Sequence, residues 1–164
     1  MVRTASTERG AIVKTSAKIT GVEQTKAKFA ELSKQLGDAV AMAVLASAES
    51  VKTTAVKSIQ EQSPGRQVIR SRAGGSTYNH IAAQAGEAPN TDTGRLSSSI
   101  AVEIDASRLT ALIGTNVDYS RVLELGSSTM EARPYLQPAL ERNREKTKNR
   151  IIRALKVQIN SNRE

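Results

Sequence analysis

The chain has 164 residues and a net charge of +8, and its only aromatic residues are Phe29, Tyr78, Tyr119 and Tyr135. It contains no cysteine, which excludes disulfides, a thiolate nucleophile and a cysteine-ligated metal. The length fits one domain, and so few large side chains can bury only a thin core, which favours a protein that covers its surface by assembly.

The positive charge belongs to the two ends of the chain. Residues 1–20 carry four basic and one acidic side chain, residues 21–140 carry twelve of each, and residues 141–164 carry eight basic and three acidic. Such an excess attracts nucleic acid or an acidic protein surface, and a solvated helical face has the same composition. No apolar run approaches the roughly 20 residues that span a bilayer. The polar start, Met1 to Gly10, lacks a signal-peptide pattern, so we expect cytoplasmic synthesis and no membrane partner.

The first half of the domain is predicted to be one long helix. We expect a flexible arm at residues 1–15, a single domain at residues 16–160, and a short β-like stretch at 17–20. From Val22 to about Gln60, apolar residues recur at spacings of three and four, as in an amphipathic helix. Gly37 costs about 1 kcal/mol relative to alanine in a helix, so we expect a bend or break near Gly37 and Asp38. The apolar stripe consists of Phe29, Leu32, Leu36, Val40, Val44, Ala48, Val51, Ala55 and Ile59.

Residues 63–98 are predicted to form an extended, glycine-rich loop. Pro64 and Gly65 end the helix, and the segment holds five of the ten glycines and two of the four prolines without a sustained apolar period. Its apolar residues also allow a short hairpin around Gly74 and Gly75. The run of serines at 97–99 suits the polar entry to a strand.

Two strands follow the loop. Ile100, Val102 and Ile104 alternate with polar or small residues, and Leu109, Ala111 and Ile113 share one face after a turn, which is the pattern of a β-hairpin with one buried face. Residues 119–125 form a short amphipathic piece that Gly126 stops, and residues 127–133 continue as a third short strand or an extended loop.

The chain ends in a second helix, which we expect Pro134 to open. Its apolar stripe contains Leu136, Leu140, Ile151, Leu155 and Ile159, whereas residues 141–150 are almost wholly polar and either solvated or turned to a partner. The fold class is therefore α+β: a small antiparallel sheet flanked by a long N-terminal helix and a C-terminal helix, with a long glycine-rich loop.

No constellation of residues indicates an enzyme. His80 is the only histidine, which excludes a two-histidine metal site and favours a packing or surface role. The acidic residues are distributed like ordinary surface acids, and the glycines lack the spacing of a phosphate loop. We therefore predict no catalytic residue, no metal site and no cofactor.

Basic residues along the last helix are the candidates for contact with DNA or with an acidic partner. Helical spacing spreads them around much of the circumference, and no aromatic residue is interleaved for base stacking, which argues against sequence-specific binding. These residues are Arg142, Arg144, Lys146, Lys148 and Arg150.

Several short motifs occur together between residues 87 and 140. They are Glu87-Ala88-Pro89, Asp92-Thr93-Gly94-Arg95-Leu96, Gly114-Thr115, Tyr119 to Gly126 with Glu124, and Arg133-Pro134-Tyr135-Leu136-Gln137-Pro138-Ala139-Leu140. In this order and spacing they resemble the minor tail, or tail-completion, proteins of long-tailed phages. Ser120 stands where alanine is common in that family, and Tyr135 where phenylalanine is common.

The residues of these motifs also have physical interpretations of their own. Thr93 and Gly94 suit a turn that needs glycine's positive φ, and Gly126 suits a helix stop. Tyr119 and Glu124 are five residues apart and do not share a helical face, so one packs inward and the other faces a partner. The candidates for the fold motif or a subunit interface are Thr93, Gly94, Arg95, Leu96, Tyr119, Glu124, Gly126, Arg133, Pro134, Tyr135 and Pro138.

The resemblance implies a structural virion protein, made in the host cytoplasm and located in the tail or neck. It would complete the tail and join it to the head as part of an oligomeric ring. Its partners would be copies of itself, connector and tail-tube proteins, and genomic DNA in the channel without sequence preference. The alternative is a non-specific nucleic-acid-binding protein that uses its basic termini.

Overall fold

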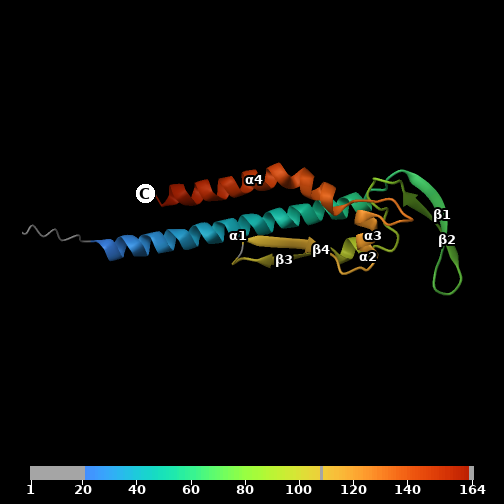
Figure 1. Cartoon of the computed structure of the whole chain (residues 1–164), viewed down its shortest axis with the longest axis horizontal. Helices are drawn as coiled ribbons and strands as arrows, with labels where there is room; N and C mark the ends of the chain where they lie inside the picture. The colour runs from blue at the N-terminus through green and yellow to red at the C-terminus, as the bar shows by residue number, and fades with distance from the viewer. Residues whose placement is uncertain (1–20, 108, 163–164) are drawn as a thin grey trace, which may run out of the picture.

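The computed structural model describes residues 21–107 and 109–162. The expected arm at 1–15 and β-like stretch at 17–20 lie outside these residues. The described chain is elongated (Figure 1): helix α1 (Val22–Gln60) runs along it, helix α4 (Leu136–Ser161) lies on one side of α1, and the hairpin of β3 (Ala101–Asp105) and β4 (Thr110–Gly114) lies on another. The predicted α+β class is confirmed.

Helix α1 is continuous from Val22 to Gln60, so the break predicted at Gly37 is wrong. A Cβ at Gly37 would meet nothing within 4 Å, which shows that no close contact requires glycine there. Neighbouring helix-forming residues carry the helix through the position, and glycine only weakens it locally.

The core lies around the C-terminal half of α1. The hairpin covers one side of this half: Val102 pairs with Ile113 and Ile104 with Ala111, and Ile113 packs against the buried cluster. Leu109, predicted to share this face, instead precedes β4 with φ 53° and is 39% exposed, so that part of the prediction is wrong. The start of α4 covers another side. The buried cluster consists of Val51, Ala55, Ile59, Leu96, Ile100, Val117, Tyr135 and Ala139.

By length and composition alone, α1 could also cross a membrane, contrary to our expectation that no segment is apolar enough. The core helix of a soluble protein passes the same test, and α1 buries Val51, Ala55 and Ile59 against the rest of the chain. The length and composition of α1 are therefore weak evidence for a membrane-spanning helix.

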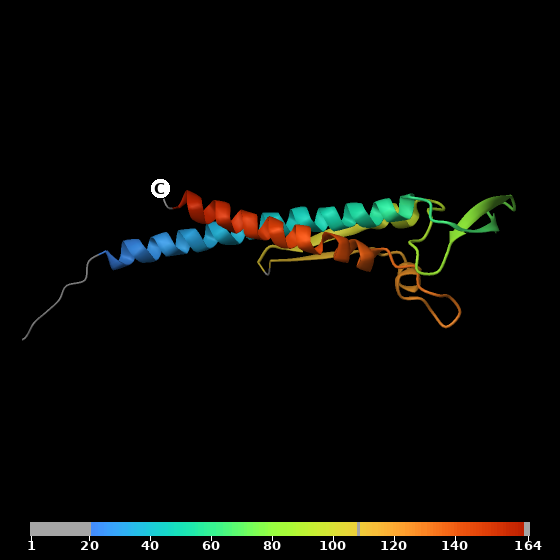
Figure 2. The ribbon, with the colours of Figure 1, turned by 90° about the horizontal axis from the view of Figure 1, so that it is seen from above.

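The segment predicted as an extended loop is partly ordered. Strands β1 (Gly65–Ser71) and β2 (Thr77–Ala83) form an antiparallel ribbon whose turn contains Gly74 and Gly75, both with positive φ, which confirms the hairpin at this position. Figures 1 and 2 show this ribbon at the far end of the molecule, beyond the end of α1.

The serine run forms a short helix, α2 (Arg95–Ser99), rather than the entry to a strand. The hydroxyls of Ser97 and Ser99 donate to the carbonyls of Gly94 and Leu96, three residues earlier in each case. Serine side chains that bond back to their own turn make such a run compatible with a helix.

Helix α4 begins at Leu136 rather than at Pro134, and its buried stripe differs from the prediction. Leu140 is 54% exposed, whereas Ala139 and Asn143 are buried. One side of the polar middle, at Asn143 and Arg150, therefore packs against α1, while most of its other residues are exposed as predicted. It does so through side-chain hydrogen bonds to the small polar residues of α1.

These hydrogen bonds form a polar seam between the two helices. The Asn143 amide donates to Thr54 Oγ1 at 2.8 Å, and the Arg150 guanidinium donates to Ser47 Oγ at 3.0 Å and to Ser50 Oγ at 3.3 Å. Further along, Gln158 donates to the Gln35 side chain at 2.8 Å. The polar seam consists of Gln35, Ser47, Ser50, Thr54, Asn143, Arg150 and Gln158.

Helix α1 extends well past this seam. It has 39 residues and α4 has 26, which correspond to lengths of about 58 and 39 Å. The predicted apolar stripe is therefore buried only in its second half. Phe29, near the free end of α1, is 67% exposed.

We predict that Asn143→Ala lowers the free energy of unfolding by about 1–3 kcal/mol, because it removes two hydrogen bonds at a buried position and leaves Thr54 without its donor. Asn149→Ala, on the exposed side of the same helix, should change it by less than about 0.5 kcal/mol. Urea unfolding followed by circular dichroism measures both. Equal losses would contradict a packed seam.

Candidate docking cleft

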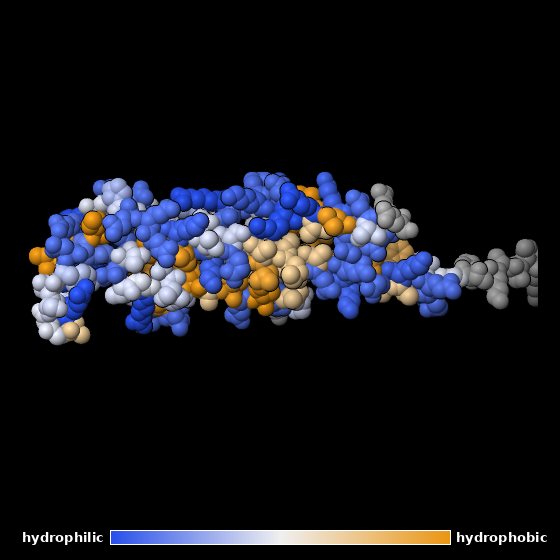
Figure 3. All heavy atoms as spheres, turned by 180° about the vertical axis from the view of Figure 1, so that it is seen from behind, coloured by the Kyte–Doolittle hydropathy of each residue, from blue (hydrophilic) through white to orange (hydrophobic). Residues whose placement is uncertain are grey.

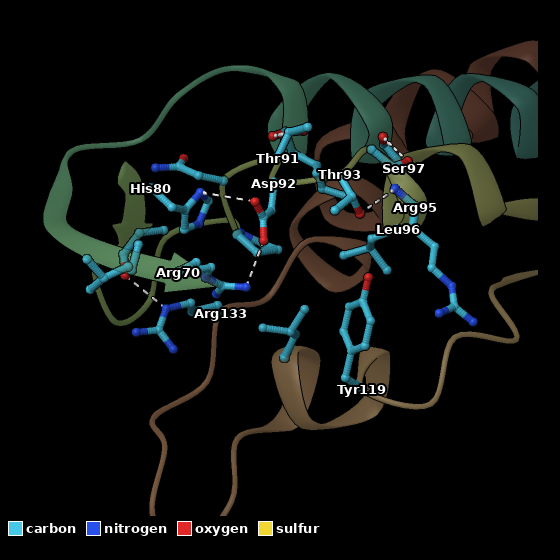
Figure 4. A pocket seen from close by; sticks show the side chains of 18 of the residues that line it. Arg70, His80, Thr91, Asp92, Thr93, Arg95, Leu96, Ser97, Tyr119 and Arg133 are labelled. Carbon is cyan, nitrogen blue, oxygen red and sulfur yellow. Dashed lines mark hydrogen bonds and ion pairs between the residues drawn. The ribbon is translucent and has the colours of Figure 1, made fainter. Parts of the chain in front are cut away.

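A cleft of about 690 Å³ lies where α1 ends. It is lined by the ribbon, by residues 89–97, and by helix α3 (Ser120–Leu125) with the loop that follows it. These parts are far apart in the sequence, and Figure 4 shows their side chains converging on one hollow. The cleft therefore brings together most of the motif residues singled out above: Thr93, Gly94, Arg95, Leu96, Tyr119 and Arg133.

The cleft has an apolar floor and a basic rim. Three arginines line it, and Asp92 is the only acidic residue among the described residues of the lining. Leu96 is buried at its base, and Val122 of α3 is 39% exposed. The apolar residues of the floor are Ile59, Val68, Leu96, Val122, Leu123 and Met130.

Asp92 organises the ribbon side of the cleft. Its carboxylate accepts hydrogen bonds from Arg70 at 2.8 Å and from the Tyr78 hydroxyl, and it lies 3.9 Å from His80 Nδ1. The hydrogen bond to this carboxylate raises the pKa of Tyr78, because the neutral phenol is the donor. Arg72 stacks over the same ring, 4.6 Å from its centre. His80 is buried here, which agrees with a packing role.

Asn90 and Thr91 fix the ribbon to the end of α1. The Asn90 amide donates to the carbonyls of Ser63 and Ile81, both at 2.9 Å, and its oxygen accepts the Ser63 N–H at 2.6 Å. Thr91 donates its hydroxyl and its N–H to the carbonyl of Ile59. Sequence reasoning missed both residues, because a single asparagine in a loop gives no sign of the distant backbone it bridges.

Arg133 and Arg95 complete the rim. Arg133 Nε donates to the carbonyl of Ala83 at 2.9 Å, which leaves its terminal amino groups available. The guanidinium of Arg95 is exposed and bonds to nothing in residues 21–107 or 109–162. Gly94, directly before it, has φ 76°, which confirms the predicted glycine turn.

Tyr119 stands between these arginines at the start of α3. Figure 4 shows its ring rising toward Leu96, with Arg95 on one side and Arg133 on the other. The residue is 44% exposed. An amphipathic ring at the mouth of an arginine-rich cleft is typical of a protein-binding surface, where tyrosine and arginine are enriched.

Glu124 points away from the cleft and caps helix α4. Oε2 accepts the N–H groups of Tyr135 and Leu136 at 2.9 and 3.0 Å, and Oε1 accepts that of Gln137 at 2.8 Å. A carboxylate at a helix N-terminus satisfies unpaired donors and complements the helix dipole. The prediction that Glu124 resembles an ordinary surface acid is therefore wrong, since it holds the fold together.

The chain returns from α3 to α4 through a tight loop at Gly126. This residue has φ 76°, and a Cβ there would lie 2.9 Å from both the Ala132 nitrogen and the Met130 oxygen. Residues 127–133 form an extended loop rather than a strand. Arg133 closes the loop, because its N–H donates to the carbonyl of Leu123 at 2.6 Å.

Tyr135 anchors the start of α4 in the core. It is 1% exposed, and burial, followed by the nearby Glu124 carboxylate, raises the pKa of Tyr135 to about 12. Pro134 and Pro138 flank it, both half-buried. None of these three predicted residues lines the cleft.

The basic residues of α4 do not form one surface with the cleft. Arg150 is turned to α1, Arg144 lies 3.8 Å from Glu141, and Lys148 lies 3.5 Å from Glu145. Arg142 and Lys146 are exposed. Figure 3 shows the polar outer side of α4 above a band of apolar residues that reaches the surface in the middle of the molecule.

A family model described as "Bacteriophage HK97-gp10, putative tail-component" matches residues 23–126. The chain belongs to this family. The match runs from α1 through the ribbon and the hairpin to Gly126, and so includes all of the cleft except Met130 and Arg133. No curated protein and no solved structure matches the chain. The resemblance to minor tail proteins is therefore confirmed as membership of a family of phage tail components.

We predict that in this tail component Glu124→Ala lowers the free energy of unfolding by about 1–3 kcal/mol, because three N–H groups lose their acceptor. Glu131→Ala, in the exposed loop nearby, is the matched control and should be nearly neutral. Thermal unfolding of the two variants compares them directly. A neutral Glu124→Ala would mean that α4 needs no cap from α3.

We predict that Gly126→Val unfolds or strongly destabilises the protein, because a β-branched residue is strained at positive φ and its Cβ would clash with backbone atoms. Gly37→Ala should instead stabilise it by about 0.5–1 kcal/mol, since the position is helical and open. Denaturant titration shows whether each variant lowers or raises the free energy of unfolding. Tolerance of valine at 126 would exclude the observed backbone.

Proposed function

We propose that the protein is a structural subunit that completes the phage tail and joins it to the head at the neck, as one copy in a ring. Family membership supports a location in the tail, and the docking cleft supports a role in assembly. The cleft is the observation that carries the proposal, because it sets arginine and tyrosine beside apolar side chains, a composition that is typical of protein-binding surfaces.

The thin core is the second support. The buried cluster contains one aromatic residue, Tyr135, while large apolar side chains remain exposed along the whole molecule. Isolated exposed apolar residues are normal, but the ribbon, the free end of α1 and the hairpin all expose large apolar side chains, among them Ile69, Phe29 and Leu112. Covering them with neighbouring subunits would add the burial that the single chain lacks.

Neighbours in such an assembly would be further copies, connector proteins and tail-tube proteins. Genomic DNA would pass through the channel of the ring without being gripped, because it must slide during ejection. Exposed basic side chains of α4 are available for such a contact: Arg142, Arg144, Lys146 and Lys148. Their contribution would be electrostatic and sensitive to salt.

The location is tested by immunogold labelling of virions with an antibody against the protein. Label at the head–tail junction is the expected result, and label along the whole tail, or none, would overturn the neck assignment. Cells infected with a phage that lacks the protein should accumulate heads and tails that fail to join.

We predict that Arg95→Glu lowers incorporation into virions by at least about tenfold, because an exposed arginine on a docking rim is a frequent hot spot and tenfold corresponds to only about 1.4 kcal/mol. Lys34→Glu places the same acidic group on an exposed side chain of α1 and should leave incorporation unchanged. Quantitative immunoblots of purified particles measure both. Loss with Lys34→Glu alone would move the docking surface from the cleft to α1.

A further inference from the structure

We infer that the occupant of the cleft is a second copy of this chain, which inserts the outer face of its β3–β4 hairpin. The inference rests on the proposed function, since it names the contact between neighbouring ring subunits. Three observations carry it: the arginines of the cleft that have unused hydrogen-bond donors, the composition of the hairpin's outer face, and the orientation of that face relative to its own cleft.

The cleft requires a partner that is both apolar and acidic. Arg70 is already paired with Asp92, but Arg95 is unpaired within the described chain and Arg133 uses only Nε. Two guanidinium groups therefore face solvent beside an apolar floor. A partner that fits must place an apolar side chain on this floor and a carboxylate within reach of the arginines, which bind carboxylates in a fork geometry.

The outer face of the hairpin offers this combination. Glu103 of β3 and Leu112 of β4 are directly opposite each other in the register, so their side chains stand next to one another on the same face. Leu112 is 70% exposed, and Glu103 has no partner in the described chain. The inner face of the hairpin packs on α1, so the outer face is the one left for a neighbour.

A molecule cannot fill its own cleft in this way. Figure 1 shows the hairpin lying along α1 with its turn pointing away from the end that holds α2, α3 and the ribbon. The contact must therefore join two different surfaces of two copies. A heterologous contact of this kind forms a ring when the rotation between copies closes, and a filament when it does not.

A protein occupant fits the cleft better than nucleic acid. Phosphates would satisfy the arginines, but the floor of leucine, valine and methionine side chains gives a phosphate backbone nothing to contact. Stacking of bases is the apolar contact that nucleic acid can make, and it uses aromatic platforms. Tyr119 is the only aromatic residue among the described residues of the lining.

Thiol cross-linking tests the contact, because the chain has no cysteine of its own. The double variant Val122→Cys with Leu112→Cys places one thiol on the cleft floor and one on the hairpin. Treating virions with a short bismaleimide should give a ladder of covalent oligomers on denaturing gels. In the control, Val122→Cys with Leu140→Cys, the second thiol lies on the exposed side of α4 and should give no ladder.

The outcomes separate this inference from the function it rests on. Normal amounts of protein in virions without a cross-linked ladder would overturn the hairpin contact and leave the neck assignment standing. Absence of the wild-type protein from virions would overturn the neck assignment. A ladder in the Leu140 control as strong as in the test pair would show that the cross-links are not specific and would overturn the contact.

A charge exchange gives an independent answer if the cysteines disturb assembly. Arg95→Glu and Glu103→Arg should each lower incorporation by at least about tenfold, because each places like charges across the contact. The double variant should recover most of the loss, since the pair is restored with reversed sign. Additive losses in the double variant would overturn the pairing, and strong binding of a DNA oligonucleotide by the cleft, abolished by Arg95→Glu, would replace it with a nucleic-acid site.

Discussion

The Glu124 carboxylate fixes the position of helix α4 relative to helix α3. It accepts three N–H groups at the start of α4, eleven to thirteen residues further along the chain. Because Glu124 itself belongs to α3, one side chain sets where two helices lie. Helix α3 supplies Val122 and Leu123 to the floor of the cleft and α4 supplies half of the long helical pair, so both the cleft and the pairing of α1 with α4 depend on this cap.

The rest of the structure uses small and polar residues where many proteins use large apolar ones. Helices α1 and α4 meet through serine, threonine, asparagine and arginine, and the core at their base contains a single aromatic ring. Hydrogen bonds of this kind add about 1 kcal/mol each and cost more than that when a buried partner is missing. Such a seam favours one arrangement of the helices over its neighbours more than it adds stability.

The sequence predicted the regular elements well because each has a strong local signal. The 39-residue helix follows from its apolar spacing, and the β3–β4 hairpin follows from strict alternation at Ile100, Val102 and Ile104. The stripe of α4 was mispredicted at Leu140, because apolar periodicity cannot reveal a seam made of hydrogen bonds. The serine run was assigned to a strand for a related reason: its helix depends on hydroxyls bonding to their own turn.

The candidate site could be predicted only as a set of motif residues. Arg95, Leu96, Tyr119 and Arg133 were singled out, and the fold brings them to one cleft. Glu124, Gly126 and Tyr135 came from the same motifs and turned out to support the fold. Sequence spacing could not separate the two groups, because the difference lies in whether the fold places each residue in the cleft or at the start of α4. Strands β1 and β2 also line the cleft, and their segment has no apolar period from which this role could be predicted.

The polar seam also fixes the register between helices α1 and α4. A slip of one helical turn would move the helices by about 5.4 Å and leave Asn143 and Arg150 facing the wrong partners. An apolar seam of alanines and leucines would tolerate such a slip far better. The seam therefore sets how far along α1 the helix α4 lies, and with it how much of the N-terminal part of α1 extends beyond α4.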